Sequence, residues 1–431
     1  MPVRLDRNSA DFDQRFAAFL AAKREVSADV EKATRAIVED VAARGDAALI
    51  EATRKFDRLQ IDASGLRIAE AEIDAAVKAC DPKTVEALAL ARERIEAFHI
   101  RQMPKDERFT DPLGVELGWR WSAVDAVGLY VPGGTAAYPS SVLMNAVPAK
   151  VAGVPRVVMV VPAPDGKLNP LVLAAAHLSG VSEIYRVGGA QAVAALAYGT
   201  STIAPVAKIV GPGNAYVAAA KRLVFGKVGI DMIAGPSEVL VIADDSGNAD
   251  WIAADLLAQA EHDASAQSIL VTNSARLAAD VERAVEGQLR TLPRAEIARA
   301  SWNDFGAIIM VDNLDQAATL ANAIAAEHLE IMTADAEGLS NKVRNAGAIF
   351  LGAHTPEAIG DYVGGSNHVL PTARSARFSS GLGVLDFMKR TSILKCGPDQ
   401  LRALGPAAMT LGKAEGLDAH SRSVGLRLNL S

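Results

Sequence analysis

Residues 236–273, PSEVLVIADDSGNADWIAADLLAQAEHDASAQSILVTN, decide the fold class of this chain. They place one continuous apolar run, EVLVI, ahead of a helical segment over 249–264 and a second apolar run, SILVT. Short apolar runs without alternation are typical of strands buried on both faces, and an intervening helix makes two such strands parallel. The stretch therefore predicts a strand, a helix and a second, parallel strand.

The same alternation extends in both directions from this stretch. Upstream of it, from Ser140 on, helices separate three more strand-like runs, and Asn169-Pro170 gives one helix an N-cap followed by proline. Downstream, three strand-like runs alternate with helices that we predict over 275–290, 314–329 and 337–346. We predict an α/β fold with two Rossmann-like, doubly wound parallel-sheet domains and smaller helical N- and C-terminal parts.

The turn at Gly235-Pro236-Ser237 separates the two alternations and predicts a domain boundary. Residues 1–105 have helical periodicity, and 107–131 have the pattern of paired strands. The predicted domains are an N-terminal helical segment at 1–25, a first α/β domain at 26–128 and 236–380, a second Rossmann-like domain at 129–235, and a helical tail at 381–431.

Composition narrows the class of partner and the compartment. The net charge of −7 argues against a nucleic acid or an anionic membrane as partner, since both select basic surfaces. No secretory signal and no spanning apolar window is recognisable. The two cysteines, Cys80 and Cys396, are far apart and outside any CxxC pattern, which favours a reducing cytoplasm.

Four residues that lie in short polar stretches within apolar segments are candidate metal ligands. Two of them are among the seven histidines of the chain. The four are Gln259 and His262 in AQAEHD, Asp361 in GDYVGG, and His420 in LDAHSRS. Imidazole, carboxylate and amide oxygen together suit a divalent cation such as zinc. Gln259 and His262 project from one helix face, where Asp255 could orient the histidine. A polar stripe on a solvated helix, and a solvated C-terminal helix around His420, are the alternatives.

Glu327 and His328 form an adjacent acid–base pair in AAEHLE. We expect the pair to end the helix that precedes the strand IMTA, because helix neighbours diverge by about 100° and face one site only at a terminus. Such a pair can move protons near neutral pH. The alternative is a helix-end histidine stabilised by the macrodipole beside a surface glutamate.

Three glycine turns precede helices and suit phosphate binding through backbone N–H groups. They are VPGGTA after Tyr130, VGGAQA, and GPGNAYV at Gly211–Val217. None fits the G-x-G-x-x-G pattern with a following acidic residue. Ordinary tight turns between strands and helices therefore remain the alternative to a dinucleotide site.

These motifs, in this order, resemble the histidinol dehydrogenase family. The matching stretches are GLYVPGGTAAYPSSVLM, VGGAQAVAALAYGT, KIVGPGNAYVAAAKR, GIDMIAGPSEVLVIAD, LLAQAEHD, AEHLEI, GDYVGGSNHVLPT and EGLDAHSRSV. The resemblance covers essentially the whole chain. It implies the four-electron oxidation of L-histidinol to L-histidine through L-histidinaldehyde, the final step of histidine biosynthesis, with two NAD molecules reduced in turn.

The resemblance also implies a role for each matching residue. It implies that one Zn²⁺ per subunit is bound by Gln259, His262, Asp361 and His420. The implied substrate contacts are the same four residues with Ser237, His328 and Glu415. The implied NAD contacts are Tyr130, Gln191 and Asn214. His328 would take the alcohol proton, and Glu327 would activate the water that hydrates the aldehyde.

The resemblance further implies a cytoplasmic homodimer in which the tail, with Glu415 and His420, completes the partner's active site. One rival is a metal-dependent hydrolase of a small polar substrate, since zinc with a glutamate base describes many hydrolases. Four protein ligands argue against it, because a hydrolytic zinc usually keeps one position for water. A second rival, a two-lobed binding protein without catalysis, is usually exported, and no signal is recognisable here.

Overall fold

The computed structural model describes residues 1–21, 28–133, 138–233 and 235–430. The expected boundary at 25/26 and the second half of the VPGGTA turn lie outside these residues. The chain forms two compact units: Met1–Gln102 with Asp125–Phe387, and Met103–Val124 with Met388–Ser431. Among the helices described, none has the length and apolar character needed to span a membrane.

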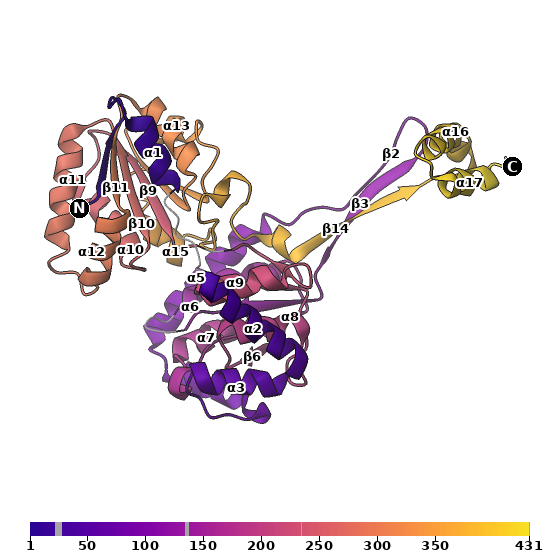
Figure 1. The fold of residues 1–431 in the computed structure, drawn as a ribbon, viewed down its shortest axis with the longest axis horizontal. Helices are drawn as coiled ribbons and strands as arrows, with labels where there is room; N and C mark the ends of the chain where they lie inside the picture. The colour runs from indigo at the N-terminus through magenta and orange to yellow at the C-terminus, as the bar shows by residue number, and fades with distance from the viewer. Residues whose placement is uncertain (22–27, 134–137, 234, 431) are drawn as a thin grey trace. The chain divides into compact units, whose positions relative to one another are not determined.

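The first unit contains a six-stranded parallel sheet in the order β1-β11-β10-β9-β12-β13 (Figure 1). Its strands are β1 (Val3–Asp6), β9 (Glu238–Ala243), β10 (Gln267–Thr272), β11 (Ala307–Met310), β12 (His328–Met332) and β13 (Ala348–Leu351). The stretch that opened the sequence analysis thus forms β9, α10 (Ala249–Ala260) and β10, as predicted. Asn248 begins α10 by accepting hydrogen bonds from the N–H groups of Asp250 and Trp251.

Both faces of this sheet are buried, which is why its strands read as continuous apolar runs. Leu240 and Ile242 pack into one core, and Val239 and Val241 pack into the opposite one. The first core is covered by α1 (Phe12–Ala21), α13 (Leu314–Ile324) and α14 (Ala336–Ser340). The second is covered by α10, α11 (Ala275–Gln288) and α12 (Ala295–Phe305) (Figure 1). The predicted doubly wound arrangement is confirmed.

The same unit contains a second parallel sheet in the order β6-β5-β4-β7-β8. Its strands are β4 (Ala126–Tyr130), β5 (Arg156–Val160), β6 (Glu183–Tyr185), β7 (Lys208–Val210) and β8 (Gly229–Ile230). The connecting helices are α6 (Pro139–Val151), α7 (Pro170–Leu178), α8 (Gly189–Tyr198) and α9 (Ala215–Val224). Asn169 caps α7 as predicted, accepting from the N–H of Leu171 at 2.9 Å.

The N-terminal helices pack against the helices of this five-stranded sheet. They are α2 (Ala28–Arg44), α3 (Asp46–Phe56), α4 (Glu70–Ala79) and α5 (Pro82–Ile100). α2 contacts α8 and α9, α4 contacts α7, and α5 contacts α6. This packing differs from the predicted grouping of 26–128 with 236–380. Helical periodicity shows that a helix has a face to bury, but it does not specify which sheet that face covers.

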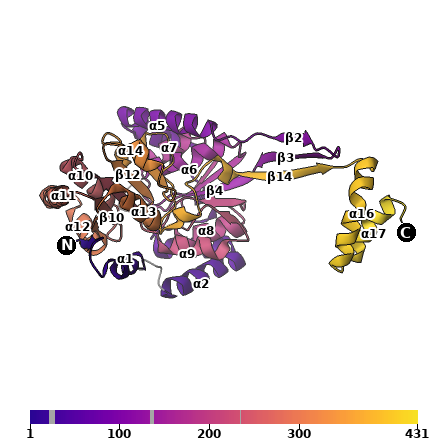
Figure 2. The ribbon, with the colours of Figure 1, turned by 90° about the horizontal axis from the view of Figure 1, so that it is seen from above.

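The second unit is a three-stranded antiparallel sheet and a helical hairpin (Figure 2). The strands, in spatial order, are β14 (Met388–Lys395), β3 (Glu116–Ala123) and β2 (Glu107–Thr110). The hairpin is α16 (Pro398–Ala414) and α17 (Asp418–Arg427), which pack on each other. The predicted strand pairing within 107–131 is present as β2 and β3, whereas β4 joins a parallel sheet. Within the tail expected at 381–431, a 3₁₀ turn and the strand β14 come first, and the chain is helical from Pro398, close to the residue from which the sequence predicts helix.

The remaining elements are α15 (Glu357–Tyr362), which follows β13, and four short 3₁₀ turns. The turns cover Ala63–Gly65, Pro164–Gly166, Ser375–Arg377 and Val384–Phe387. The long segment after Gly352 is therefore largely irregular, as its glycine and serine content predicts. It carries Asp361 on α15.

Candidate active site

Glu327 and His328 lie at the amino end of β12, where the structure corrects the predicted helix end. Helix α13 stops at Ile324 because Ala325 takes a left-handed conformation with φ 51°. His328 is the first residue of β12 and pairs in register with Val239 of β9 and Ala348 of β13. Sheet pairing on both sides outweighs the helical periodicity of this segment. Both side chains are buried, with 5% of Glu327 and 3% of His328 exposed.

Backbone groups of β9 hold the acid–base pair in place. The N–H of Glu238 donates to Oε2 of Glu327 at 3.0 Å, and the carbonyl of Glu238 lies 3.2 Å from Nδ1 of His328. This contact sets Nδ1 as the protonated ring nitrogen. Nε2 of His328 has no hydrogen-bond partner among the residues described. The pair is therefore fixed through the backbone, and one imidazole nitrogen is left for another group.

Two carboxylates of α15 complete the surroundings of His328. Nδ1 of His328 lies 3.5 Å from Oε1 of Glu357, and Nε2 lies 3.7 Å from Oδ1 of Asp361. Ligand atoms of these three residues lie within 4.8 Å of one another, close enough for one cation. Burial lowers the pKa of His328, but Glu357, Glu327 and Asp361 outweigh it and raise the pKa well above its usual value. The carboxylates therefore stabilise the protonated, imidazolium form of this ring.

The pKa values of the carboxyl groups in this cluster are shifted in opposite directions. Burial raises the pKa of Glu327 to about 7 and that of Glu357 to about 8. Burial also acts to raise the pKa of Asp361, but the neighbouring ring of His328, with Nε2 at 3.7 Å from Oδ1, lowers it below its usual value. Opposed shifts in one cluster separate a carboxylate that stays ionised from an acid that exchanges its proton near neutral pH.

Gln259 and His262 lie together at the end of α10, as their spacing predicts. Because α10 runs back against the strands, its C-terminus lies at the same amino edge of the sheet as Glu238 and His328. Nε2 of Gln259 lies 3.4 Å from Nδ1 of His262. Oε1 of Gln259 is buried and has no donor among the described residues. A buried acceptor without a donor fits a cation ligand.

Asp255 does not orient His262, contrary to the sequence interpretation. Its carboxyl group hydrogen-bonds with Glu330, and burial raises its pKa to about 6. Glu330 in turn accepts from the N–H of Glu357 at 2.8 Å. Sequence reasoning missed Glu238, Glu330 and Glu357, which lie in apolar strands or follow a proline. Of these three, Glu357 could have been recognised from the sequence, because it lies four residues before Asp361 and therefore on the same helix face.

The other predicted site residues are distributed over both units. Ser237 immediately precedes β9. Nδ1 of His368 lies 2.9 Å from the carbonyl oxygen of Asp361. Glu415 ends α16 and His420 lies on α17, and both are exposed in the second unit.

Tyr130, Gln191 and Asn214 lie beyond the carboxyl ends of strands in the five-stranded sheet. Tyr130 ends β4, and its hydroxyl accepts from the N–H of Gly189 at 2.9 Å. Gln191 is buried in the first turn of α8. Asn214 caps α9 by accepting from Tyr216 and Val217. The strand order changes direction between β4 and β7, and ligands of open α/β sheets bind at such a switch point.

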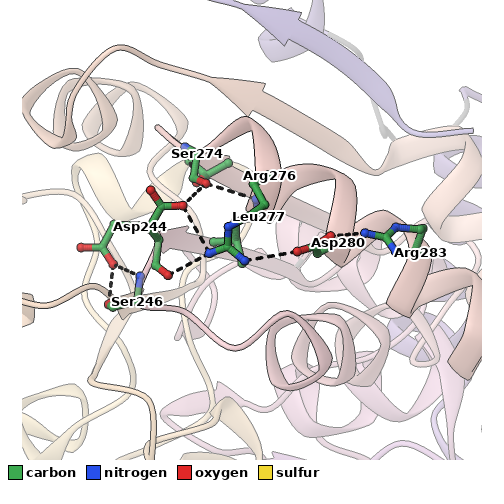
Figure 3. A network of polar contacts seen from close by, with 9 residues as sticks. Asp244, Ser246, Ser274, Arg276, Leu277, Asp280 and Arg283 are labelled. Carbon is green, nitrogen blue, oxygen red and sulfur yellow. Dashed lines mark hydrogen bonds and ion pairs between the residues drawn. The ribbon is translucent and has the colours of Figure 1, made fainter.

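The six-stranded sheet has its own switch point between β9 and β12, but a carboxylate occupies its carboxyl edge. Asp244 accepts from the N–H of Ser246 (Figure 3) and also from the N–H of Ala334, each at 3.0 Å. Beside it, Ser274 donates to Asp245, and Arg276 contacts Asp245 and Asp280 (Figure 3). Asp244 thus takes two backbone N–H donors that a phosphate at this edge would need. The five-stranded sheet is therefore the better candidate for a dinucleotide.

The sequence profile of the histidinol dehydrogenase family matches residues 20–428 of the chain. The chain belongs to the histidinol dehydrogenase family. Histidinol dehydrogenase of Bradyrhizobium diazoefficiens is 85% identical over 431 residues, and that of Brucella suis is 69% identical over 430, each covering 100% of both chains. The crystal structure of histidinol dehydrogenase from Elizabethkingia anophelis matches with a TM-score of 0.94 and 35% identity, covering 99% of this chain and 98% of that one.

Family membership makes the protein an oxidoreductase and confirms the resemblance on which the residue roles depend. The structural match extends over both parallel sheets and the antiparallel unit, since it leaves out only 1% of the chain. The roles of the individual site residues stay predictions, and they are taken up next as proposals.

Proposed function

We propose that this protein oxidises L-histidinol to L-histidine through L-histidinaldehyde and transfers two hydrides in turn to NAD. The observation that carries the proposal is the buried Glu327–His328 pair, held by β9 beside Asp361, in a chain of the histidinol dehydrogenase family. An alcohol and then an aldehyde hydrate must each lose a proton before hydride leaves. The two residues offer one proton acceptor for each step.

His328 is proposed to take the proton of the alcohol. Its Nδ1 is held by the carbonyl of Glu238, so Nε2 is the nitrogen that can accept. The neighbouring carboxylates stabilise the imidazolium that forms when the proton arrives. Proton removal raises electron density on the alcohol oxygen, and hydride can then leave the adjacent carbon.

Glu327 is proposed to activate the water that hydrates the aldehyde. One of its oxygens is engaged by the N–H of Glu238, and the other can face water. A pKa of about 7 suits a general base, because a substantial fraction is ionised near neutral pH while the group remains basic. Glu327 would take the proton of this water as the hydrate forms, which leaves the electron density on oxygen that lets hydride leave.

Gln259, His262 and Asp361 are proposed to hold a zinc ion together with His420. Each of the first three is in a form that suits a ligand: Gln259 has an orphan oxygen, partial desolvation keeps the pKa of His262 low, and Asp361 stays ionised. When bound, the ion supplies a positive charge that anchors the imidazole and amino nitrogens of histidinol. The same donor set also accepts manganese or cobalt.

The NAD site is proposed at the switch point of the five-stranded sheet, with Tyr130, Gln191 and Asn214 as contacts. The N-termini of α8 and α9 lie at this edge and present N–H groups suited to a pyrophosphate. When bound, NAD accepts hydride from the substrate carbon. Tyr130 keeps its proton because burial raises its pKa to about 12, so it acts there as a neutral hydrogen-bonding group.

We further propose a cytoplasmic homodimer with shared active sites, in which Ser237 and the partner's Glu415 complete the substrate contacts. His420 is exposed in the second unit, so its side chain is accessible to the active site of another subunit. The cytoplasmic location rests on two free cysteines, Cys80 and Cys396, in a chain without a disulfide among its described residues.

The test of the proposed reaction is a count of NADH formed per histidinol consumed. We expect about two NADH per histidinol, because an alcohol and an aldehyde each yield one hydride. Absorbance of the reduced nicotinamide measures NADH, and chromatography measures histidinol and histidine. A single NADH with accumulating aldehyde would refute the second step, and hydrolysis of a substrate without NADH would favour the metal-dependent hydrolase.

Shared active sites predict complementation between two inactive variants. His420→Asn and His328→Asn subunits are each expected to be nearly inactive as homodimers. Unfolding and refolding them together should restore about a quarter of the wild-type rate, because half of the dimers are mixed and each has one intact site. Mixtures as inactive as their parents would contradict the shared site, and two tagged wild-type preparations report whether subunits exchange.

A further inference from the structure

We propose that the buried ion pair of Lys221 and Asp231 is a positioning element for the NAD site, because it clamps the backbone of Gly211 at the start of the loop 211–214. The inference rests on the NAD site proposed above. It assigns to these two residues a role in cofactor affinity and none in contact with histidinol.

The ion pair encloses both polar groups of Gly211. Nζ of Lys221 donates to the carbonyl of Gly211 at 3.0 Å, and the N–H of Gly211 donates to Oδ2 of Asp231 at 2.8 Å. Lys221 and Asp231 also bond directly to each other. Only 2% of the lysine side chain and 1% of the aspartate side chain is exposed. Two buried charges thus fix the two peptide groups that flank the Cα of Gly211.

Gly211 lies where a small displacement changes the spacing of two strand ends. It has a φ of +105°, and a Cβ at this position would lie 2.2 Å from the carbonyl oxygen of Tyr130. The backbone after β7 therefore touches the backbone at the end of β4. These two strand ends border the switch point at which we propose NAD.

The clamp also connects the loop to the helix that follows it. Lys221 lies on α9, about two turns beyond the cap Asn214, and its side chain reaches back to the loop. Asp231 follows the edge strand β8 and accepts from its neighbour Met232 as well. One ion pair thus joins the ends of β7 and β8 to α9, and sets where the N-terminal N–H groups of α9 point.

A contribution to stability alone does not explain this arrangement. Replacing a buried ion pair by apolar residues of similar volume is often neutral or stabilising, because desolvation offsets the attraction. What apolar residues cannot supply is a donor for the carbonyl and an acceptor for the N–H of Gly211. The particular contribution of the two side chains is the orientation of the backbone on either side of Gly211.

The test replaces both charges at once with Lys221→Met and Asp231→Leu. We expect a folded protein whose Kd for NADH and KM for NAD rise by about ten-fold or more, with the KM for histidinol within about two-fold of wild type. NADH fluorescence gives the Kd, and circular dichroism monitors folding. The matched control is Arg156→Met with Glu183→Leu, an ion pair between the amino ends of β5 and β6 in the same sheet. It should leave NADH binding unchanged.

Asp231→Asn is the second variant, since it keeps an acceptor for Gly211 and removes only the charge. Because Gly211 keeps its donor and its acceptor in this variant, the Kd for NADH should rise much less than in the double variant, while the KM for histidinol holds. An unchanged Kd in the folded double variant, or an equal rise in both variants, would overturn the inference while the proposed function stands. Equal rises in NADH Kd and histidinol KM would also overturn it, by indicating general disruption. Wild-type protein that does not bind NADH would instead refute the NAD site itself.

Discussion

His262→Asn is expected to remove the bound metal and the dehydrogenase activity together. His262 offers the imidazole of the proposed ligand set, next to Gln259, whose Oε1 has no protein donor among the described residues. Asparagine is shorter and cannot place a nitrogen where the ring does. Loss of an outer-shell partner costs about 10–100-fold in metal affinity or activity, so loss of a direct ligand should cost at least about 100-fold.

Metal content by atomic spectroscopy and NADH formation from histidinol, measured on the same preparation, check this expectation. His177→Asn is the matched control, because His177 is exposed on α7 and the substitution is the same. Added zinc should partly restore the variant if affinity alone has fallen. Full activity in a variant that retains no metal would exclude His262 as a ligand of a functional ion.

The residues near this site show what the sequence could predict. Gln259 and His262 were paired correctly because spacing on one helix fixes a shared face, whatever that helix packs against. Both parallel sheets were predicted for a similar reason, since strands buried on two faces carry continuous apolar runs. Features that depend on the residues of a single helix or strand can therefore be predicted from the sequence alone.

Properties that depend on two elements were predicted less well. The helix before Glu327 was predicted too long, because pairing of β12 with β9 and β13 decides where the strand begins. The sequence predicts that Asp255 orients His262, whereas in the structure Asp255 of α10 hydrogen-bonds with Glu330 of β12. The assignment of the N-terminal helices to a sheet failed in the same way. For site residues that lie far apart in the sequence, only the resemblance to a family suggested which role each one has.

Glu327→Gln is expected to reduce aldehyde oxidation by about 100-fold or more and to reduce alcohol oxidation much less. A positioned general base contributes about 10²–10⁴ in rate, and the amide keeps the shape of the side chain but accepts no proton. The oxygen that receives the N–H of Glu238 can be retained, so the fold at β9 and β12 should be preserved. Histidinaldehyde supplied directly and histidinol supplied with NAD separate the two steps.

The dependence of aldehyde oxidation on pH is a second test of the role of Glu327. A carboxylate base acts only when ionised, so a pKa of about 7 predicts that wild-type aldehyde oxidation rises with pH through 7 and then levels off. Glu327→Gln should lose that limb together with the rate, while exposed Glu296→Gln on α12 should keep both. Equal losses in the two oxidation steps would count against water activation by Glu327. The pair would then act as one unit on the alcohol, with His328 as its proton acceptor and Glu327 as the neighbouring charge that stabilises the imidazolium.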